Sequence, residues 1–134
     1  MRHELGHQAD TAIGRQAGFS GKASMESGSF QAEVAQKIKP LLEAYLKNTK
    51  SSNQYIAYRL KNEEIFADLM SKATPEVRKI LVSTVDAKEG MKLLAEVISQ
   101  NANAARGFGG LTAADFGTPQ NNPGGQNNTQ SKTN

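Results

Sequence analysis

Apolar side chains between residues 30 and 100 recur every three or four positions, which is the spacing of helices that bury one face. The spacing predicts one helix over residues 30–47. Another helix is predicted over residues 2–17, where His3, His7 and Asp10 or Thr11 recur at the same helical intervals. The helix over residues 30–47 should direct one stripe of side chains inward: Phe30, Val34, Ile38, Leu41, Leu42 and Tyr45. No segment alternates apolar and polar residues as a half-buried strand does, so we expect a mainly α-helical fold.

Glycine, serine and proline mark the places where these helices should end. Residues 18–29 are rich in Gly and Ser and predict a loop, and residues 48–53 predict a polar connection. Pro40 lies inside the second helix. It predicts a kink or a break near Lys39, because proline lacks the backbone N–H that a helix interior uses.

Capping signals predict further helices in the second half of the chain. Each begins at a polar residue that favours a helix N-terminus: Asn62 before Glu63 and Glu64, Thr74 before Pro75, and Asp86 before Glu89. The last of these helices should continue through Ile98, with an apolar face turned inward.

The composition of the chain changes near its C-terminal end. Residues 107–134 are almost uncharged and rich in Gly, Asn, Gln and Thr. Such a segment cannot bury enough apolar surface to offset the entropy that it would lose on ordering. The sequence therefore predicts a helical domain over residues 1–105 and a disordered tail over residues 106–134.

The overall composition narrows the classes of site and partner. The chain contains no cysteine, which excludes disulfide bonds and thiolate metal ligands. Its formal charge is +3, and Lys and Arg form no dense run or basic amphipathic stripe, so we expect neither a nucleic-acid nor a membrane partner. No apolar run is long enough to span a bilayer and no secretory signal is visible, which leaves the localisation open.

The most specific chemical pattern lies in the first predicted helix, at His3-Glu4-Leu5-Gly6-His7. Residues four apart on a helix share one face, so both imidazoles can bind one zinc ion. Glu4 would lie on the neighbouring stripe, within reach of a zinc-bound water. The alternative is a polar helix with an accidental motif, but both histidines of the chain fall inside it. Gly6 fits the small residue needed where such a helix packs closely.

A catalytic zinc site takes a third protein ligand, and without a further His or any Cys this ligand must be a carboxylate. Glu64 is the best candidate, because Asp68 follows one helical turn later and could accept the outer N–H of a ligating histidine. The sequence equally allows Glu63 and Glu64 to be first-turn acids that only favour the positive end of the helix dipole.

Two segments carry a resemblance to a known family. HELGHQADTAIG at residues 3–14 has the form H-E-hydrophobic-G-H-x-x-D-x-x-x-G, and EIFAD at residues 64–68 follows a tyrosine. Together they resemble the catalytic domain of anthrax lethal factor and related gluzincin peptidases. They also resemble zincin-like domains in large multidomain proteins of phages and mobile elements. The resemblance covers residues 2–18 and about 55–70.

The resemblance implies a role for each residue that matches by position. The implied roles are His3, His7 and Glu64 as ligands of Zn²⁺, Glu4 as the general base, and Tyr58, or else Tyr55, as the donor that stabilises the oxyanion. Asp10 and Gly14 match structural positions that close and shape the active-site helix. Asp68 would hold a ligating imidazole from behind.

Zincin domains place a sheet and a helix before the motif helix, and the edge strand of that sheet binds the substrate backbone. The resemblance therefore implies that this chain is the helical C-terminal part of such a domain, completed by an upstream segment or a partner chain. Two functions follow. The first is zinc-dependent hydrolysis of a peptide or protein substrate, as a fragment of a larger metallopeptidase. The second is a non-catalytic helical remnant that binds zinc or a partner in a phage or mobile-element protein.

Overall fold

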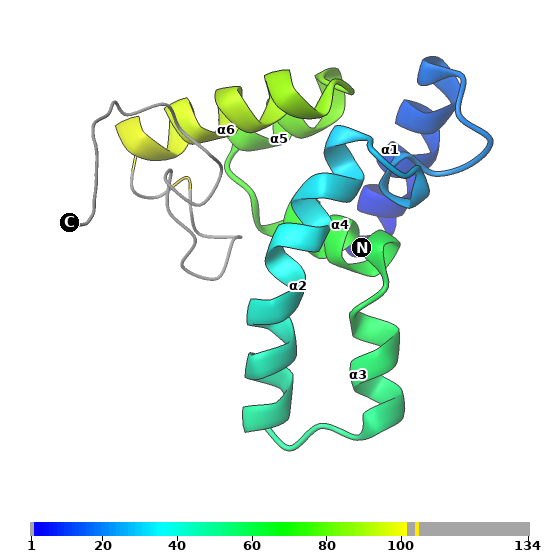
Figure 1. Cartoon of the computed structure of the whole chain (residues 1–134), viewed down its shortest axis with the longest axis vertical. Coiled ribbons are helices and arrows are strands. Elements are labelled where there is room, and N and C mark those ends of the chain that lie inside the picture. Colours follow the sequence, from blue (N-terminus) through cyan, green and yellow to red (C-terminus); the bar gives the residue numbers. More distant parts are fainter. Residues whose placement is uncertain (1, 102–103, 105–134) are drawn as a thin grey trace.

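The computed structural model describes residues 2–101 and residue 104, and this part of the chain is mainly α-helical (Figure 1), as predicted. Its elements follow in the order α1 (Arg2–Ala17), the short 3₁₀ helix η1 (Ala23–Met25), α2 (Phe30–Asn48), α3 (Asn53–Arg59), α4 (Asn62–Lys72), α5 (Pro75–Ser83) and α6 (Ala87–Gln100). The described residues form no strand, only an isolated bridge between Ser29 and Asp86. The tail predicted over residues 106–134 lies outside the described residues.

Side-chain caps begin several helices where the sequence predicts them. The Thr74 hydroxyl accepts a hydrogen bond from the Val77 N–H at 3.3 Å, at the start of α5. The Asp86 carboxylate accepts one from the Glu89 N–H at 2.7 Å, at the start of α6. These caps satisfy backbone donors that the first turn of a helix leaves unpaired, which is why the boundaries can be found from the sequence.

Two predictions about residues 48–62 are wrong. The polar connection is shorter than predicted, because Ser52 caps an unpredicted helix, α3, by accepting from the Tyr55 N–H. The N-cap of α4 is Lys61, which makes no side-chain cap, and Asn62 is the first helical residue. The Asn62 amide is used elsewhere: it donates to the Ser24 carbonyl at 3.0 Å and accepts from Gln36 at 3.0 Å. Long-range hydrogen bonds thus override the local capping preference.

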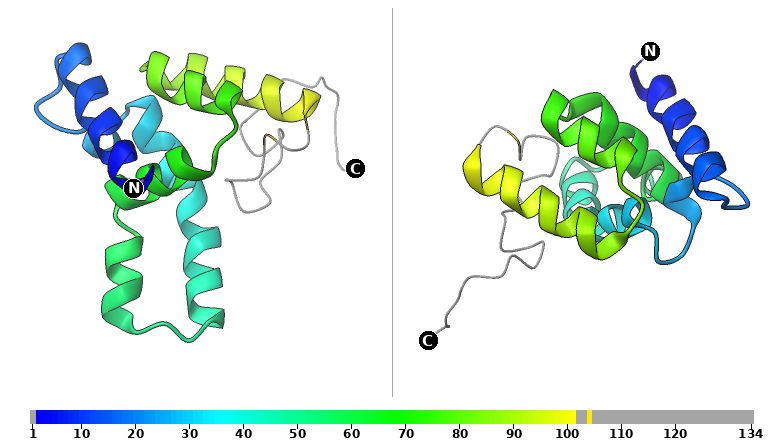
Figure 2. Two further views of the ribbon diagram at one scale, coloured as in Figure 1. Left: turned by 180° about the vertical axis from the view of Figure 1, so that it is seen from behind. Right: turned by 90° about the horizontal axis from the view of Figure 1, so that it is seen from above.

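The second helix also differs from its prediction. α2 is continuous through Pro40, so of the kink or break predicted near Lys39 only the break is ruled out. The inward stripe holds only in the first half of the helix, since Leu41 is 39% exposed and Tyr45 is 62% exposed, whereas Leu46 is buried. The physical reason is that only the N-terminal half of α2 lies against the other helices. Its C-terminal half lies beside α3 alone, away from the remaining helices (Figures 1 and 2).

The hydrophobic core lies where α1, α2 and α4 meet and continues between α2, α5 and α6. Its large members are fully or almost fully buried and come from every α-helix except α1 and α3: Phe30, Val34, Ile65, Phe66, Leu69, Val77, Leu81 and Leu94. Gly90 allows α6 to approach α2, because a Cβ there would lie 2.2 Å from the Phe30 ring. None of the described helices has the length and the apolar character needed to cross a bilayer.

Candidate metal centre

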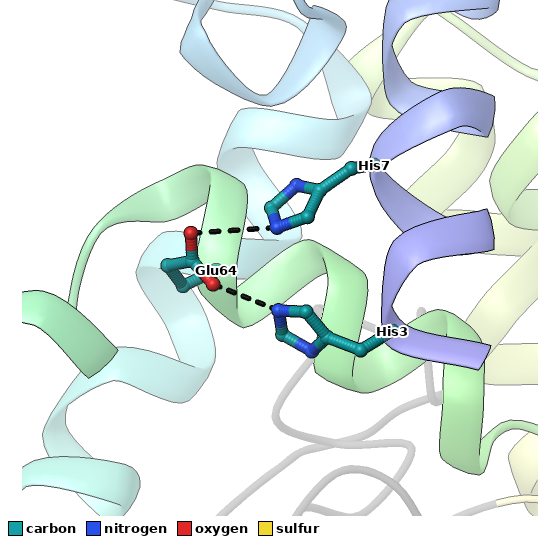
Figure 3. A group of neighbouring side chains, drawn as sticks. All are labelled: His3, His7 and Glu64. Carbon is teal, nitrogen blue, oxygen red and sulfur yellow. Dashed lines mark hydrogen bonds and ion pairs between the residues drawn. The ribbon is translucent and has the colours of Figure 1, made fainter. Parts of the chain in front are cut away.

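The two motif histidines lie one turn apart on the face of α1 that meets α4 (Figure 3). Their ring centroids are 4.8 Å apart, and the ring planes are nearly perpendicular at 81°. α1 can approach α4 this closely because Gly6 has no side chain: a Cβ there would lie 2.8 Å from the Cα of Ala67. The predicted need for a small residue at position 6 is thereby confirmed.

Glu64 extends from the first turn of α4 and faces both rings (Figure 3). Its Oε1 lies 2.8 Å from Nε2 of His3, and its Oε2 lies 3.4 Å from Nε2 of His7. Potential ligand atoms of the three residues all lie within 4.8 Å of one another. Among the described residues, His3, His7 and Glu64 form the one group of three or more His, Cys, Asp or Glu side chains that lie close enough together to hold a metal ion.

The electrostatic surroundings of Glu64 favour its charged form. The side chain is only 7% exposed, and burial by itself raises the pKa of a carboxyl. Hydrogen bonding with His3 and Tyr58, together with the charges of both histidines, outweighs burial and holds the pKa of Glu64 below its usual value. An ionised carboxylate is therefore available to a cation in this centre.

Asp68 lies behind the centre, one turn after Glu64. Its Oδ1 is 3.0 Å from Nδ1 of His3, and its Oδ2 accepts a hydrogen bond from Nη2 of Arg59 at 3.0 Å. The other guanidinium nitrogen, Nη1, donates to the Tyr55 hydroxyl at 2.8 Å. Both ring nitrogens of His3 therefore face carboxylates. If Nδ1 carries the proton and donates it to Asp68, Nε2 is the nitrogen that could bind a metal ion held between His3 and Glu64.

These residues fit zinc. Two imidazole nitrogens and one carboxylate form the donor set of a catalytic zinc site with an open position. Nδ1 of His7 is buried without a hydrogen-bond partner among the described residues, and its Nε2 is farther from Glu64 than that of His3. His7 therefore has fewer and longer polar contacts than His3. A metal bond at its Nε2 would give this ring a polar partner at short distance.

The two residues expected to act on the substrate are both exposed. Glu4 is exposed and makes no hydrogen bond or ion pair to the side chains that the structure describes. Tyr58 is 48% exposed. Hydrogen bonding between its hydroxyl and the Glu64 carboxylate, followed by the charge of that carboxylate, raises the pKa of Tyr58. Of the two tyrosines, Tyr58 is thus the one whose pKa responds to Glu64, while the hydroxyl of the alternative, Tyr55, accepts a hydrogen bond from Arg59.

Asp10 and Gly14 shape the far half of α1. Asp10 is fully buried and accepts hydrogen bonds from the backbone N–H and the hydroxyl of Ser24. Burial raises the pKa of Asp10 in spite of these bonds. At Gly14, a Cβ would lie 1.9 Å from the Gly21 carbonyl oxygen, so the loop can pass only over a glycine. Asp10 thus ties the loop before α2 to the motif helix, and it forms its hydrogen bonds with Ser24 and with neither histidine.

Sequence reasoning did not identify Arg59 or Ser24. Arg59 lies one helical turn after Tyr55, and that spacing was the only available signal, in a segment with no predicted helix. Ser24 lies in a Gly- and Ser-rich stretch whose composition indicates a loop but no particular contact. Comparison of the chain with family models, with curated protein sequences and with solved structures finds no match.

Proposed function

We propose that this chain binds one zinc ion through His3, His7 and Glu64 and provides the metal centre of a gluzincin-type peptidase. The observation that carries the proposal is the convergence of these three side chains from helices that are sixty residues apart in the sequence. The sequence offers the histidine pair, and the packing of α1 on α4 brings an ionised carboxylate to it. The proposed reaction is hydrolysis of a peptide bond by water.

The ligand residues have separate tasks in this proposal. His3 and His7 donate nitrogen lone pairs, and Glu64 contributes the negative charge that balances the cation. Asp68 holds His3 in the tautomer that presents Nε2 to the centre. A bound zinc ion would act as a Lewis acid, which acidifies a water molecule and polarises the scissile carbonyl.

Glu4 and Tyr58 carry the proton transfer and the charge stabilisation. The exposed Glu4 carboxylate takes a proton from the attacking water and passes it to the leaving amine. The hydroxyl of the exposed Tyr58, whose pKa responds to Glu64, donates a hydrogen bond to the oxyanion as the carbonyl is attacked. A tyrosine hydroxyl keeps its proton at neutral pH at its ordinary pKa of 10.0, and the pKa of Tyr58 is shifted further upward, so the hydroxyl remains a donor.

A second candidate function is zinc binding without catalysis. It is favoured by one observation: Glu4 has no partner among the described side chains that would hold its carboxylate toward the centre. A metalloenzyme positions its general base, so an unrestrained Glu4 suits a structural or partner-binding site equally well. Both candidates use the same ligands, and only turnover separates them.

Metal analysis of matched variants tests the shared part of the proposal. His7→Ala and Glu64→Gln should lose stoichiometric zinc when measured by elemental mass spectrometry after dialysis. Glu63→Gln is the matched control, because the neighbouring Glu63 faces Lys22, at 3.4 Å, instead of the histidines. Equal zinc content in Glu64→Gln and the wild type would place the metal elsewhere.

A peptide-cleavage assay then separates the two candidates. With the zinc-loaded chain, Glu4→Gln should keep its metal and lose nearly all turnover, while Tyr58→Phe should keep its metal and lose about 10²-fold in rate, a typical effect of removing one oxyanion donor. Zinc binding without cleavage of any peptide in a mixed-sequence library, in the wild type, would favour the non-catalytic function.

A further inference from the structure

The α2–α3 hairpin carries a concentration of positive charge that the overall composition hides. We define the arm as residues 37–61, from the middle of α2 to the residue before α4. It contains six Lys or Arg and a single acid, Glu43, so its formal charge is +5. Because the whole chain carries only +3, all other residues together carry a net −2. The basic balance of this protein is therefore a property of the arm.

The arm also exposes much of the apolar and aromatic surface. Its exposed large side chains are Leu41, Tyr45, Tyr55 and Tyr58, which are half of all such side chains in the described residues. Along α2, Leu41 and Tyr45 follow Lys37 at intervals of four residues, so a positive charge and two exposed apolar side chains share one side of the helix. Lys39 and Lys47 lie on the other side of the stripe that contains the buried Ile38 and Leu46. Exposed tyrosines are enriched at protein-binding faces, and the surrounding lysines supply positive charge that can attract an acidic partner.

The arm is continuous with the candidate metal centre. Its last helix, α3, contributes Arg59, whose guanidinium donates a hydrogen bond to Asp68 at 3.0 Å, and Asp68 in turn contacts Nδ1 of His3. Figure 1 shows α2 and α3 side by side, joined at the end away from α4, so the arm extends outward from the edge of the centre. A chain that lay along the arm would therefore lead to the proposed zinc ligands.

We propose that the arm docks an acidic polypeptide segment of the substrate. The charge of the arm is complementary to carboxylates, and the exposed tyrosines offer contacts to apolar side chains between them. Phosphate is less well matched, because it is best held by the fork of a free arginine. Arg59, the one arginine of the arm, is already bonded to Asp68 and Tyr55. This inference deepens the proposed peptidase function by naming a substrate class, and it rests on that function.

Fluorescence anisotropy with defined probes tests the docking. The first probe is a labelled peptide of Glu, Leu, Ser and Gly; the second has Lys in place of every Glu; the third is a labelled oligothymidylate. The zinc-loaded Glu4→Gln variant is used so that nothing is cleaved. We expect the acidic peptide to bind at low ionic strength, with an affinity that falls as salt is added, and the basic peptide not to bind.

Two double variants with equal changes in charge localise the effect. Lys47→Glu/Lys50→Glu reverses charge at the end of the arm, and Lys88→Glu/Lys92→Glu makes the same change on exposed positions of α6. The arm variant should weaken binding of the acidic peptide about tenfold and the α6 variant less than about twofold, since only nearby exposed charges interact strongly. If charge reversal lowers the thermal midpoint, Lys47→Gln/Lys50→Gln replaces it and should give about threefold.

The other outcomes overturn either the docking inference or the proposed peptidase function. Equal weakening by both double variants would mean a response to net charge alone, and no binding of the acidic peptide would remove the docking surface. Tighter binding of the oligothymidylate than of the peptide would assign the arm to single-stranded nucleic acid. Zinc content and peptide cleavage are measured separately from binding. If the arm variants cleave acidic peptides as fast as the wild type does, docking by the arm is refuted, but the peptidase proposal stands. A chain without zinc or turnover that still binds the peptide refutes only the proposed function.

Discussion

The α1–α4 pair and the α2–α3 arm are both pairs of neighbouring helices, but their polar residues lie in different environments. Between α1 and α4 the backbones approach over Gly6, and polar side chains are partly or fully buried and paired with one another. In the arm only Ile38, Leu46 and Ile56 are buried, and most polar side chains are exposed to solvent. Close packing therefore concentrates chemistry in the first region, and loose packing leaves surface for recognition in the second.

The largest effect should come from closing the space between α1 and α4. Gly6→Leu forces a side chain against the Ala67 backbone, which lies 2.8 Å from the position of the Cβ, and should destabilise the fold by about 3 kcal/mol. Ala44→Leu adds a similar side chain to an exposed position of the arm and should change stability by less than about 0.5 kcal/mol. Urea denaturation followed by circular dichroism measures both. Equal effects would show that the two regions are packed alike.

Loss of the buried acceptor Asp10 should have the next largest effect. Asp10→Ala leaves the backbone N–H and the hydroxyl of Ser24 without their acceptor in a buried place, which should cost about 2 kcal/mol. Asp86→Ala removes an exposed helix cap and should cost only about 1 kcal/mol in the same denaturation experiment. A larger loss for Asp86→Ala would contradict the structural role assigned to Asp10.

Arg59 links the two regions, and its replacement should weaken the metal centre without unfolding it. Arg59→Met releases Asp68, so His3 is held less firmly, and zinc affinity should fall about tenfold, the lower end for residues that support a ligand from outside. Arg78→Met is the matched control, because Arg78 donates to the carbonyls of Met70 and Ala73 instead. Competition with a chromophoric chelator measures the affinity, and an unchanged value in Arg59→Met would argue against the link.

The pH dependence of stability should also distinguish the centre from the arm. The pKa of Glu64 is lowered in the folded metal-free protein, so the folded state binds its proton less readily than the unfolded state does. Its contribution to stability is complete above the unfolded value, near 4.5, and is lost as pH falls through the lower folded value. Glu64→Gln should flatten the acid side of the stability profile, and Ala44→Leu in the arm, which changes no ionisable group, should leave it unchanged. Parallel profiles for wild type and Glu64→Gln would contradict this assignment.

The smallest effect on stability is expected at the exposed aromatic surface of the arm. Tyr45 is 62% exposed, so Tyr45→Ala should alter the free energy of unfolding by less than about 0.5 kcal/mol. The same variant should weaken binding of the acidic peptide, because it removes a contact surface while leaving the charge intact. A stability loss comparable to that of a core substitution would show that the arm is packed more tightly than its exposure indicates.

Much of the helical fold and the histidine pair of the candidate metal centre follow from residue patterns within single helices. Periodic apolar residues place α1, α2 and α4 to α6 on the chain, and Thr74 and Asp86 cap helices by contacts that span only three residues. The four-residue spacing brings His3 and His7 onto one face for the same reason, since helical geometry alone sets that relation. The short helix α3 and the exposure of Tyr45 were missed because neighbouring elements decide them.

The remainder of the centre depends on contacts between distant helices. The sequence by itself determined that any third ligand must be a carboxylate, since the chain has no cysteine and no further histidine, but it left Glu63 and Glu64 equivalent. The rotation of α4 against α1 separates them: Glu64 faces the imidazoles, and Glu63 faces Lys22. Successive residues on a helix point about 100° apart, so only a tertiary contact can select one of two neighbours, and Gly6 makes that contact close enough.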